Sequence, residues 1–547
     1  MLKHLSLAKW GVAVLLLSSL TGCEDILEQY FPKPTPPPTN PTPPNLGLDI
    51  PFYALSGGTR LDAYSTKDPA TRTASVSITG LQSSERILAI DFRPGTGQLY
   101  GVSSGSRIYV INQNTGKAHV IGAGAFSPAL GGNVVSFDFN PAVDRIRLVT
   151  STGQNLRIHP ETGAVAATDG NINGAAGATV TGVAYTNNVA GASTTALYGI
   201  NTQNQQLYLV NPPNNGTLVA VGNLNLNVSG DGGFDIDAKT GTALGLYSVN
   251  GSPTLFTVDL TTGAARTLAS YSTSLNYTGL AIPTRPVAYI VTNVRNGLDV
   301  TFNTFTIIDP TDSNSYTTKS VTGIGVGEST IGVDFRPATG QLYTIVIARD
   351  RSSSRLYTID LATGAATRVA DLNANVTVVS AGNFDFDPVT DMIRLASSYG
   401  QNFRVNPTTG FTTADPSFGI PVGSNLPVNP RTIAHDNNFV GATASNLYGI
   451  EYSVNLISKL YQIIPLVTGP DNLRQIGDVT ADVRDLDIGG TSNTAYMFVN
   501  TVNGPNMYQI NTLNLSTGAR TFARSINIPG IDGSNWIPSG FALGLGF

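Results

Sequence analysis

The sequence predicts an all-β protein of the β-propeller class, built as two tandem five-bladed rings of four-stranded blades. Three observations predict this fold: a composition suited to short strands, a duplication that relates the two halves, and a shorter period inside each half. One ring of ten blades is the alternative that the same observations allow.

The composition favours short strands and turns. Charged residues make up only 12% of the 547 residues, whereas glycine occurs 58 times. This balance is typical of strands joined by turns, and no long apolar pattern of helical period interrupts it. The formal net charge of −5 argues against nucleic acid as a partner, because phosphate binding needs clustered Lys and Arg.

The two halves of the chain align with each other. Residues 90–101 match residues 333–344 at nine of twelve positions, and residues 137–160 match residues 384–407 at fourteen of twenty-four positions. Agreement at this level indicates a duplicated domain.

A shorter repeat lies inside the first half, with equivalent strand positions 47 to 51 residues apart at Tyr53, Tyr100, Arg147, Tyr198 and Leu246. This is the length of a propeller blade. One unit is predicted to form four strands joined by hairpin turns, over residues 86–92, 98–103, 107–112 and 117–122. A Thr-Gly pair recurs at the last turn of most units, where glycine can adopt a positive φ.

A strand is left over at the end of each half, at residues 278–282 and 539–543. Residues 52–55 lack a first strand of their own, so a leftover strand can complete their blade. The link over 280–291 resembles an ordinary connection within a blade and favours a single ring. Domain size favours two rings, with modules at 46–285 and 286–547.

The start of the chain predicts export and a lipid anchor. The apolar run within residues 1–22 is too short to span a bilayer and indicates a signal peptide. It ends in Leu-Thr-Gly before Cys23, the only cysteine, and this resembles a bacterial lipobox. Acyl chains on Cys23, palmitate among them, would anchor the protein to the membrane, and the proline-rich linker over 23–45 would extend from it.

The repeated segments resemble a bacterial family known only as domain of unknown function 4394. The first half carries its motifs at 90–100 (IDFRPGTGQLY), 144–157 (DRIRLVTSTGQNLR) and 185–188 (YTNN). The second half departs from them at Met392 and at residues 435–438. The resemblance implies a propeller-like fold and an extracytoplasmic setting, and it carries no activity.

The sequence offers no catalytic set and no cofactor motif. The histidines are not at metal-ligand spacing from one another, and no nucleotide-binding pattern occurs. Residues 101–105 match the GxSxG pattern, but they lie in a predicted hairpin and not in a strand-turn-helix context.

Acidic residues at one repeat position are the better candidates for a site, namely Asp91, Asp138, Asp235, Asp334, Asp385 and Asp487. First strands line the channel of a propeller, so these side chains could share one space. Some are doubled at i and i+2 on one strand face, and paired hard oxygens suit calcium. The candidate calcium ligands are therefore Asp138, Asp235, Asp237, Asp385 and Asp387.

A structural role for these aspartates is the favoured interpretation. Buried carboxylates need partners, which could be Arg147, Arg394, hydroxyl groups or backbone amides. Arg93 and Arg336, two positions after an aspartate, favour ion pairing over a ring of metal ligands.

Three functions fit the sequence. The first is a non-catalytic binding or scaffold module of the bacterial cell envelope, periplasmic or surface-exposed, that holds an envelope protein or glycan. The second is a calcium-assisted hydrolase or lyase with the aspartates at the ring channel. The third is a purely structural spacer.

Overall fold

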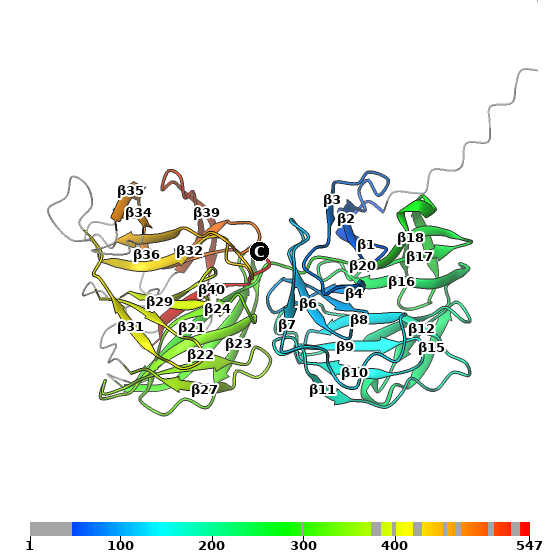
Figure 1. Ribbon diagram of the computed structural model, residues 1–547, viewed down its shortest axis with the longest axis horizontal. Coiled ribbons are helices and arrows are strands. Elements are labelled where there is room, and N and C mark those ends of the chain that lie inside the picture. Colours follow the sequence, from blue (N-terminus) through cyan, green and yellow to red (C-terminus); the bar gives the residue numbers. More distant parts are fainter. Residues whose placement is uncertain are drawn as a thin grey trace, which may run out of the picture. The chain divides into compact units, whose positions relative to one another are not determined.

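The structure is a computed structural model that describes residues 46–296, 299–373, 384–396, 401–419, 429–451, 457–464, 472–500, 508–526 and 536–547. Within these residues it contains forty strands, two short 3-10 helices and no α-helix. The strands form ten four-stranded antiparallel sheets (Figure 1). The predicted signal peptide, Cys23 and the linker lie outside the described residues.

The first five sheets use the first twenty strands. Their bounds, blade by blade from the inner strand outward, are β20 (Tyr277–Ala281), β1 (Pro51–Ser56), β2 (Arg60–Ser65) and β3 (Ala74–Ser77); β4 (Ile87–Phe92), β5 (Leu99–Ser103), β6 (Ile108–Ile111) and β7 (Ala118–Ile121); β8 (Val135–Asn140), β9 (Arg145–Thr150), β10 (Asn155–Ile158) and β11 (Val165–Thr168); β12 (Val180–Tyr185), β13 (Leu197–Asn201), β14 (Gln206–Val210) and β15 (Leu218–Asn223); β16 (Val228–Ile236), β17 (Ala243–Val249), β18 (Ser252–Val258) and β19 (Ala265–Ser270). The 3-10 helices η1 (Pro213–Asn215) and η2 (Thr273–Leu275) lie in loops of this half.

The other five sheets follow the same plan. Their bounds are β40 (Trp536–Leu543), β21 (Ala288–Asn296), β22 (Asp299–Asp309) and β23 (Asp312–Val321); β24 (Ser329–Arg336), β25 (Gln341–Ile347), β26 (Ser354–Ile359) and β27 (Ala366–Asp371); β28 (Phe384–Asp387), β29 (Met392–Ala396), β30 (Asn402–Val405) and β31 (Thr412–Asp415); β32 (Pro430–His435), β33 (Leu447–Glu451), β34 (Ser458–Ile464) and β35 (Asn472–Val479); β36 (Asp482–Ile488), β37 (Ala495–Asn500), β38 (Tyr508–Leu513) and β39 (Arg520–Ile526).

Each half completes its own first blade with its own last strand. The strand β20 pairs with β1, and β40 pairs with β21, as the leftover strands predicted. Inner strands contact one another in cyclic order, from β4 through β8, β12, β16 and β20 back to β4, and from β24 through β28, β32, β36 and β40 back to β24. The chain therefore forms two rings of five blades and not one ring of ten. The described strands form ten separate ladders, so the blades of a ring are joined by packing and by hydrogen bonds outside these ladders.

Burial explains the pattern of each blade. All six residues of the inner strands β4 and β12 are buried, whereas the outer strand β3 is largely exposed. Inner strands are covered on both faces by neighbouring blades, so they appear in the sequence as continuous apolar runs. The Thr-Gly turns connect the third and outer strands of a blade and need glycine. Gly116 has a φ of 74°, and a Cβ there would lie 2.0 Å from the carbonyl oxygen of Ser77.

The repeat positions predicted from spacing lie on the second strands of their blades, and one of them needs a correction. Tyr100 and Arg147 lie opposite Asp91 and Asp138, and the residue opposite Asp235 is Leu244. Leu246 therefore lies two residues beyond the equivalent position. Leu246 pairs with Gly233, and residue spacing alone could not distinguish these two positions on the same strand face.

Aromatic side chains fill the joints between blades. The rings of Tyr100 and Phe139 meet edge to face at 5.1 Å, and those of Tyr343 and Phe386 do so at 5.3 Å in the second half. Phe139 directly follows Asp138 in the sequence, so the repeated aspartates lie next to the apolar core. The tyrosines Tyr100 and Tyr343 are buried in this core.

Candidate functional site

Each ring places aspartates at one register position of its inner strands. In the first ring they are Asp91 on β4, Asp138 on β8 and Asp235 on β16. Ala184 on β12 and Ala281 on β20 occupy the position in the other two blades. We call the three aspartates the first triad.

The second ring repeats this arrangement. Asp334 on β24, Asp385 on β28 and Asp487 on β36 form the second triad. Ala434 on β32 and Ala542 on β40 complete the ring. The order around both rings is the same: two consecutive aspartates, an alanine, an aspartate and an alanine.

The carboxylates of each triad converge. One carboxylate oxygen from each member of a triad lies within 4.8 Å of those of the other two. The side chains come from three blades and are almost completely buried, with exposed fractions of 1% in the first triad and 2–3% in the second. Each ring therefore contains a closed cluster of three acidic groups.

Backbone amides of adjacent blades bind these carboxylates. Asp91 accepts the N–H of Phe92 through Oδ1 and that of Phe139, on the next blade, through Oδ2, both at 2.7 Å. Asp235 does the same with Ile236 and Ile282, both at 2.6 Å. A carboxylate that binds amides on two blades holds the blades together, because each buried N–H needs an acceptor.

Asp138 differs from the other two members of the first triad. Its Oδ1 accepts the N–H of Tyr185 at 3.0 Å. Within the described residues, its Oδ2 accepts no hydrogen bond. One oxygen of the first triad is therefore left without a protein donor.

The second triad uses the same bonds. Asp334 accepts the N–H groups of Phe335 at 2.7 Å and Phe386 at 2.8 Å. Asp487 accepts those of Ile488 and Leu543, both at 2.6 Å. The remaining member, Asp385, accepts the backbone N–H of His435 at 2.9 Å through Oδ2, and the same oxygen hydrogen-bonds to the ring Nδ1 of His435.

The electrostatics follow from burial. Loss of water raises the pKa of Asp91 and Asp138 well above the ordinary value, and repulsion by neighbouring aspartates raises it further. Burial also raises the pKa of Asp235 and of Asp487 to about 7, against the lowering effect of their backbone donors. Burial lowers the pKa of His435 to about 4, so its imidazole is neutral near pH 7.

The five candidate calcium ligands separate into two groups. Asp138, Asp235 and Asp385 belong to the triads. The carboxylate of Asp237 accepts the backbone N–H of Thr240 at 2.8 Å and the hydroxyl of Thr240 at 2.6 Å, and Asp387 accepts the N–H of Val389 at 2.9 Å. Both aspartates cap turns, Asp387 as the last residue of β28 and Asp237 directly after β16, so the i and i+2 doubling did not identify convergent groups.

Sequence reasoning placed the remaining triad members, Asp91, Asp334 and Asp487, at the repeat position but did not include them among the ligands. The signal that finds them is the register position alone.

The arginines near the triad positions in the sequence pair with other aspartates and do not contact the triads. Arg93 donates from Nε to Asp144 at 2.9 Å, and Arg336 donates in the same way to Asp391 at 2.9 Å. Arg147 pairs with Asp169 at 2.6 Å. Within the described residues, the triads are bound by backbone amides, one of the partners expected from the sequence, and Asp385 is also bound by the ring of His435, whereas Arg147 and Arg394 pair with Asp169 and Asp415.

The layer next to the triad differs between the rings. In the second ring Asp485, on β36, accepts the N–H of Phe541 at 2.7 Å and the hydroxyl of Thr432 at 3.0 Å. The residue two positions before the triad aspartate on the matching strand β16 is Gly233. The second ring therefore has a fourth buried carboxylate, Asp485, whose pKa burial raises to about 7.

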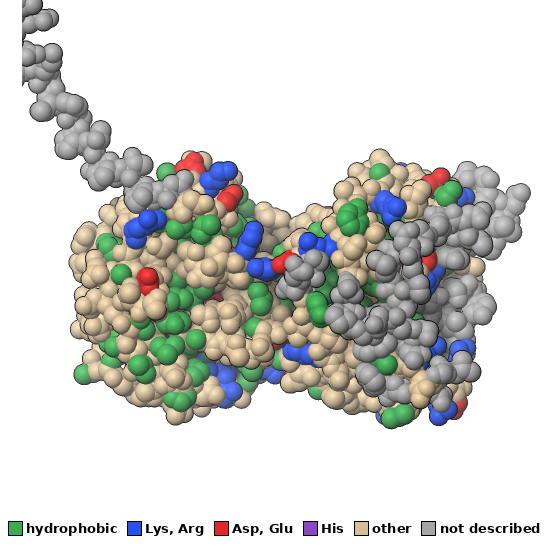
Figure 2. All heavy atoms as spheres, turned by 180° about the vertical axis from the view of Figure 1, so that it is seen from behind, with side chains coloured by type: hydrophobic (Ala, Val, Ile, Leu, Met, Phe, Trp, Pro, Cys, Tyr) green, Lys and Arg blue, Asp and Glu red, His purple; other side chains and the backbone are tan. Residues whose placement is uncertain are grey.

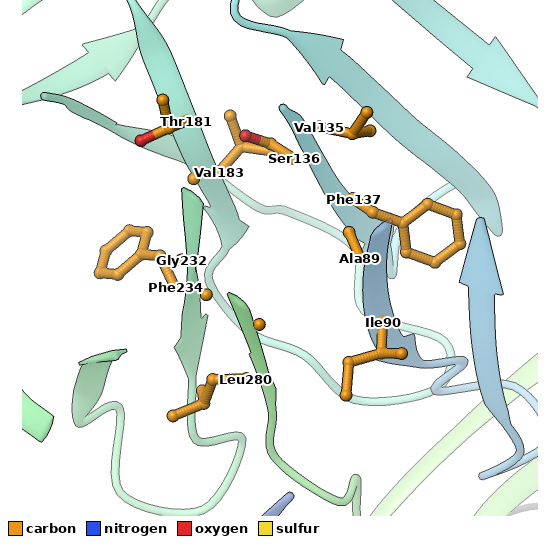
Figure 3. A pocket seen from close by; sticks show the side chains of 13 residues that line it. Ala89, Ile90, Val135, Ser136, Phe137, Thr181, Val183, Gly232, Phe234 and Leu280 are labelled. Carbon is orange, nitrogen blue, oxygen red and sulfur yellow. The ribbon is translucent and has the colours of Figure 1, made fainter. Parts of the chain in front are cut away.

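A small cavity of about 10 Å³, room for about one water molecule, lies in the first ring (Figure 3), and its lining includes Ile90 and Phe137, the residues before Asp91 and Asp138. Small residues open it, since Ser136, Gly182, Gly233 and Gly279 are among those that line it. Ser136 precedes Asp138 by two residues on β8, so both side chains leave the same face of the strand. Its hydroxyl is 3% exposed and has no hydrogen-bond partner.

The GxSxG match is structural. Ser103 ends the strand β5, is completely buried, and its hydroxyl accepts the N–H of Gly105 at 3.3 Å within the hairpin. This geometry lacks the exposed nucleophile that a hydrolase elbow presents.

Fold and site together define a tandem five-bladed β-propeller with one buried acidic triad in each ring. Residues 60–281 and 304–532 match the model of a family described as a domain of unknown function (DUF4394). The chain belongs to this family and carries two copies of its domain, one in each ring.

Solved structures of low similarity accompany this family match. A nidogen–laminin complex is 13% identical, with a TM-score of 0.30, and the match covers 48% of this chain and 99% of that chain. A protein from Lactobacillus plantarum (13%, 0.25) and a putative 6-phosphogluconolactonase from Bacteroides uniformis (11%, 0.25) each match over 66% of this chain and 98% of theirs. These values carry no functional inference.

No protein of curated function matches the sequence. Among the described residues, no helix has the length and apolar character needed to cross a membrane.

Proposed function

We propose that the chain is a non-catalytic binding or scaffold module of the bacterial cell envelope, which holds an envelope protein or glycan on its rings. The observation that supports this proposal best is the use of the repeated aspartates, whose oxygens bind backbone amides of adjacent blades in both rings. Residues used in this way stabilise a rigid frame, and the loops at its rim are free to specialise in recognition.

The competing hypothesis is a calcium-assisted hydrolase or lyase. It requires acidic groups that converge and that a substrate can reach. The triads converge, but their side chains are at most 3% exposed. A polymer cannot contact groups that are closed off by five blades, so the geometry favours the non-catalytic role.

The surface charge supports a protein or glycan as the partner. The chain carries a formal net charge of −5. On the face shown in Figure 2, Lys and Arg side chains lie in small groups among neutral atoms. A nucleic-acid site would need a continuous basic patch.

The predicted anchor on Cys23 and the proline-rich linker would hold the rings at a distance from the membrane. A Cys23→Ser variant tests this part. In cells fed a clickable palmitate, we expect wild-type chain to be labelled and membrane-bound, and the variant to be unlabelled and released by washing. Equal membrane retention of both chains would contradict the anchor.

Binding is tested with the purified chain immobilised on a sensor surface. We expect saturable binding of an isolated envelope glycan or of a purified envelope protein, with the ligand recovered intact. Release of reducing ends, unsaturated sugars or phosphate from the ligand would instead favour the hydrolase or lyase. Absence of binding to all envelope fractions would reduce the function to that of a spacer.

A further inference from the structure

The first triad contains three carboxylates and no compensating basic side chain. Among the described residues, no Lys, Arg or His forms an ion pair with Asp91, Asp138 or Asp235. Uncompensated charge in a closed interior is costly, so it must be neutralised either by protons or by a cation.

The geometry of the first triad suits a hard divalent cation. Calcium binds carboxylate oxygens at about 2.3–2.6 Å, so two ligands of one ion lie at most about 5 Å apart. The three oxygens of the triad lie within 4.8 Å of one another. The N–H bonds to Asp91 and Asp235 do not prevent coordination, because each carboxylate oxygen has two lone pairs.

Two oxygens on β8, one of them in the triad, lack hydrogen-bond partners within the described residues. Asp138 Oδ2 accepts no hydrogen bond within the described residues, whereas Oδ1 of the same carboxylate binds Tyr185. The hydroxyl of Ser136 is 97% buried and also has no partner. Ser136 lines the cavity shown in Figure 3 and lies two residues before Asp138 on the same face of β8. A buried hydroxyl without a partner indicates a missing ligand or water.

We propose that the first ring holds one hard divalent cation, best matched by Ca²⁺, between the carboxylates of Asp91, Asp138 and Asp235, with Ser136 facing the same space. The cation joins three of the five blades along the ring axis. Its role is to stabilise the ring that precedes the second module, and it goes beyond the binding function proposed above because it involves no external partner.

The second ring is the internal comparison for this proposal. There the ring nitrogen of His435 binds Asp385, which is the counterpart of Asp138. Thr432 and Asp485 bind each other in the adjacent layer, where the first ring has Gly182 and Gly233. Protein groups thus occupy places that are open in the first ring, and we assign no cation there.

The experiment compares metal content in three forms of the full-length chain, purified in detergent without chelator and dialysed against Ca²⁺. Asp138→Asn keeps the carbonyl acceptor for Tyr185 but removes the carboxylate. Asp237→Asn is the matched control, since it neutralises a turn-capping aspartate of the same ring. We expect elemental analysis to show one calcium fewer per chain in Asp138→Asn and an unchanged content in Asp237→Asn.

Thermal unfolding provides the second measurement and does not depend on the variants folding. After long exposure to EGTA, wild-type chain should unfold at a lower temperature than chain kept in Ca²⁺. Ser136→Ala should shift the calcium titration of this effect to higher concentrations. Calcium content in Asp138→Asn equal to that of wild type would overturn the proposal. Wild-type chain without bound metal and without response to EGTA would also overturn it, and would assign the neutralisation to protons.

Discussion

The two rings share a triad and differ in the layer beside it. Both place three aspartates and two alanines in the same order, and in both the carboxylates bind N–H groups of the next blade. The adjacent layer has Gly233 in the first ring and Asp485 in the second. The matching strands β12 and β32 also differ, because the residue after the alanine is Tyr185 on β12 and His435 on β32.

This difference indicates which part of the duplicated domain is constrained by the fold. An aspartate that satisfies amides on two blades cannot be replaced without leaving buried N–H groups unpaired. The adjacent layer only has to fill space and satisfy its own polar atoms, so it diverged. The triad therefore belongs to the frame of the domain, and the neighbouring layer distinguishes its two copies.

The largest expected effect tests whether the triads are equivalent. Asp235→Ala leaves the N–H groups of Ile236 and Ile282 without their acceptor, and Asp487→Ala does the same to Ile488 and Leu543. Each unpaired buried donor costs about 1–3 kcal/mol. We expect each variant to lower the free energy of unfolding of its ring by about 2–4 kcal/mol, measured by urea denaturation.

The control for this comparison is Asp237→Ala, which removes a turn cap and should have the smaller effect. A loss in Asp235→Ala no larger than in this control would show that the triad does not hold the blades together. A large loss in one ring only would show that the two triads are not equivalent.

The next effect concerns the layer that differs. A Cβ on Gly233 would lie 1.9 Å from the backbone nitrogen of Leu280, so the first ring cannot accept a side chain there without moving a strand. We expect Gly233→Ala to destabilise the first ring by about 1–3 kcal/mol, read from the thermal unfolding midpoint. Gly241→Ala, where a Cβ meets nothing within 4 Å but φ is 71°, is a control for backbone strain alone. Equal losses in both variants would contradict the packing argument.

Much of the fold could be predicted from the sequence because the duplication exposes it twice. The predicted strands of the unit at 86–122 agree with β4 to β7 within one residue at each end. Spacing alone missed the equivalent position in the last unit of the first half, which is Leu244, opposite Asp235, and not Leu246. The choice between one ring and two depended on long-range pairing, which β20 and β40 decide.

The site was predicted in position but not in composition. The repeat identified all six triad aspartates as equivalent. The i and i+2 rule then selected Asp237 and Asp387, which lie at the ends of their strands and bind turn residues. Local spacing describes one strand face, whereas convergence of three blades is set by ring closure, and no single segment contains that information.

A smaller effect distinguishes the second ring by pH. The pKa of Asp485 and of Asp487 is raised from 3.8 to about 7, so the folded chain holds protons that the unfolded chain has released. The stability from these protons is complete below the unfolded pKa and is lost as the pH rises through about 7. In EGTA-treated chain we expect a loss of about 1–2 kcal/mol between about pH 6 and 8.

The measurement is the unfolding midpoint of the second ring against pH. Asp485→Asn cannot ionise, so its midpoint should fall less steeply over the same range. If the wild-type midpoint rose with pH, the buried carboxyls would have lowered pKa values and the electrostatic description of this ring would be wrong.

The smallest effect concerns His435 and Tyr185, which follow the equivalent alanines Ala434 and Ala184. His435→Phe removes the ring hydrogen bond to Asp385 but keeps the backbone N–H that the same carboxylate accepts. In the first ring, Tyr185→Phe removes a hydroxyl that accepts Arg147 Nε at 3.2 Å. Each change removes one side-chain bond, so we expect losses of about 1 kcal/mol in either ring by urea denaturation. A loss in His435→Phe as large as in Asp487→Ala would mean that the imidazole, and not the amide bonds shared by both rings, holds the second triad in place.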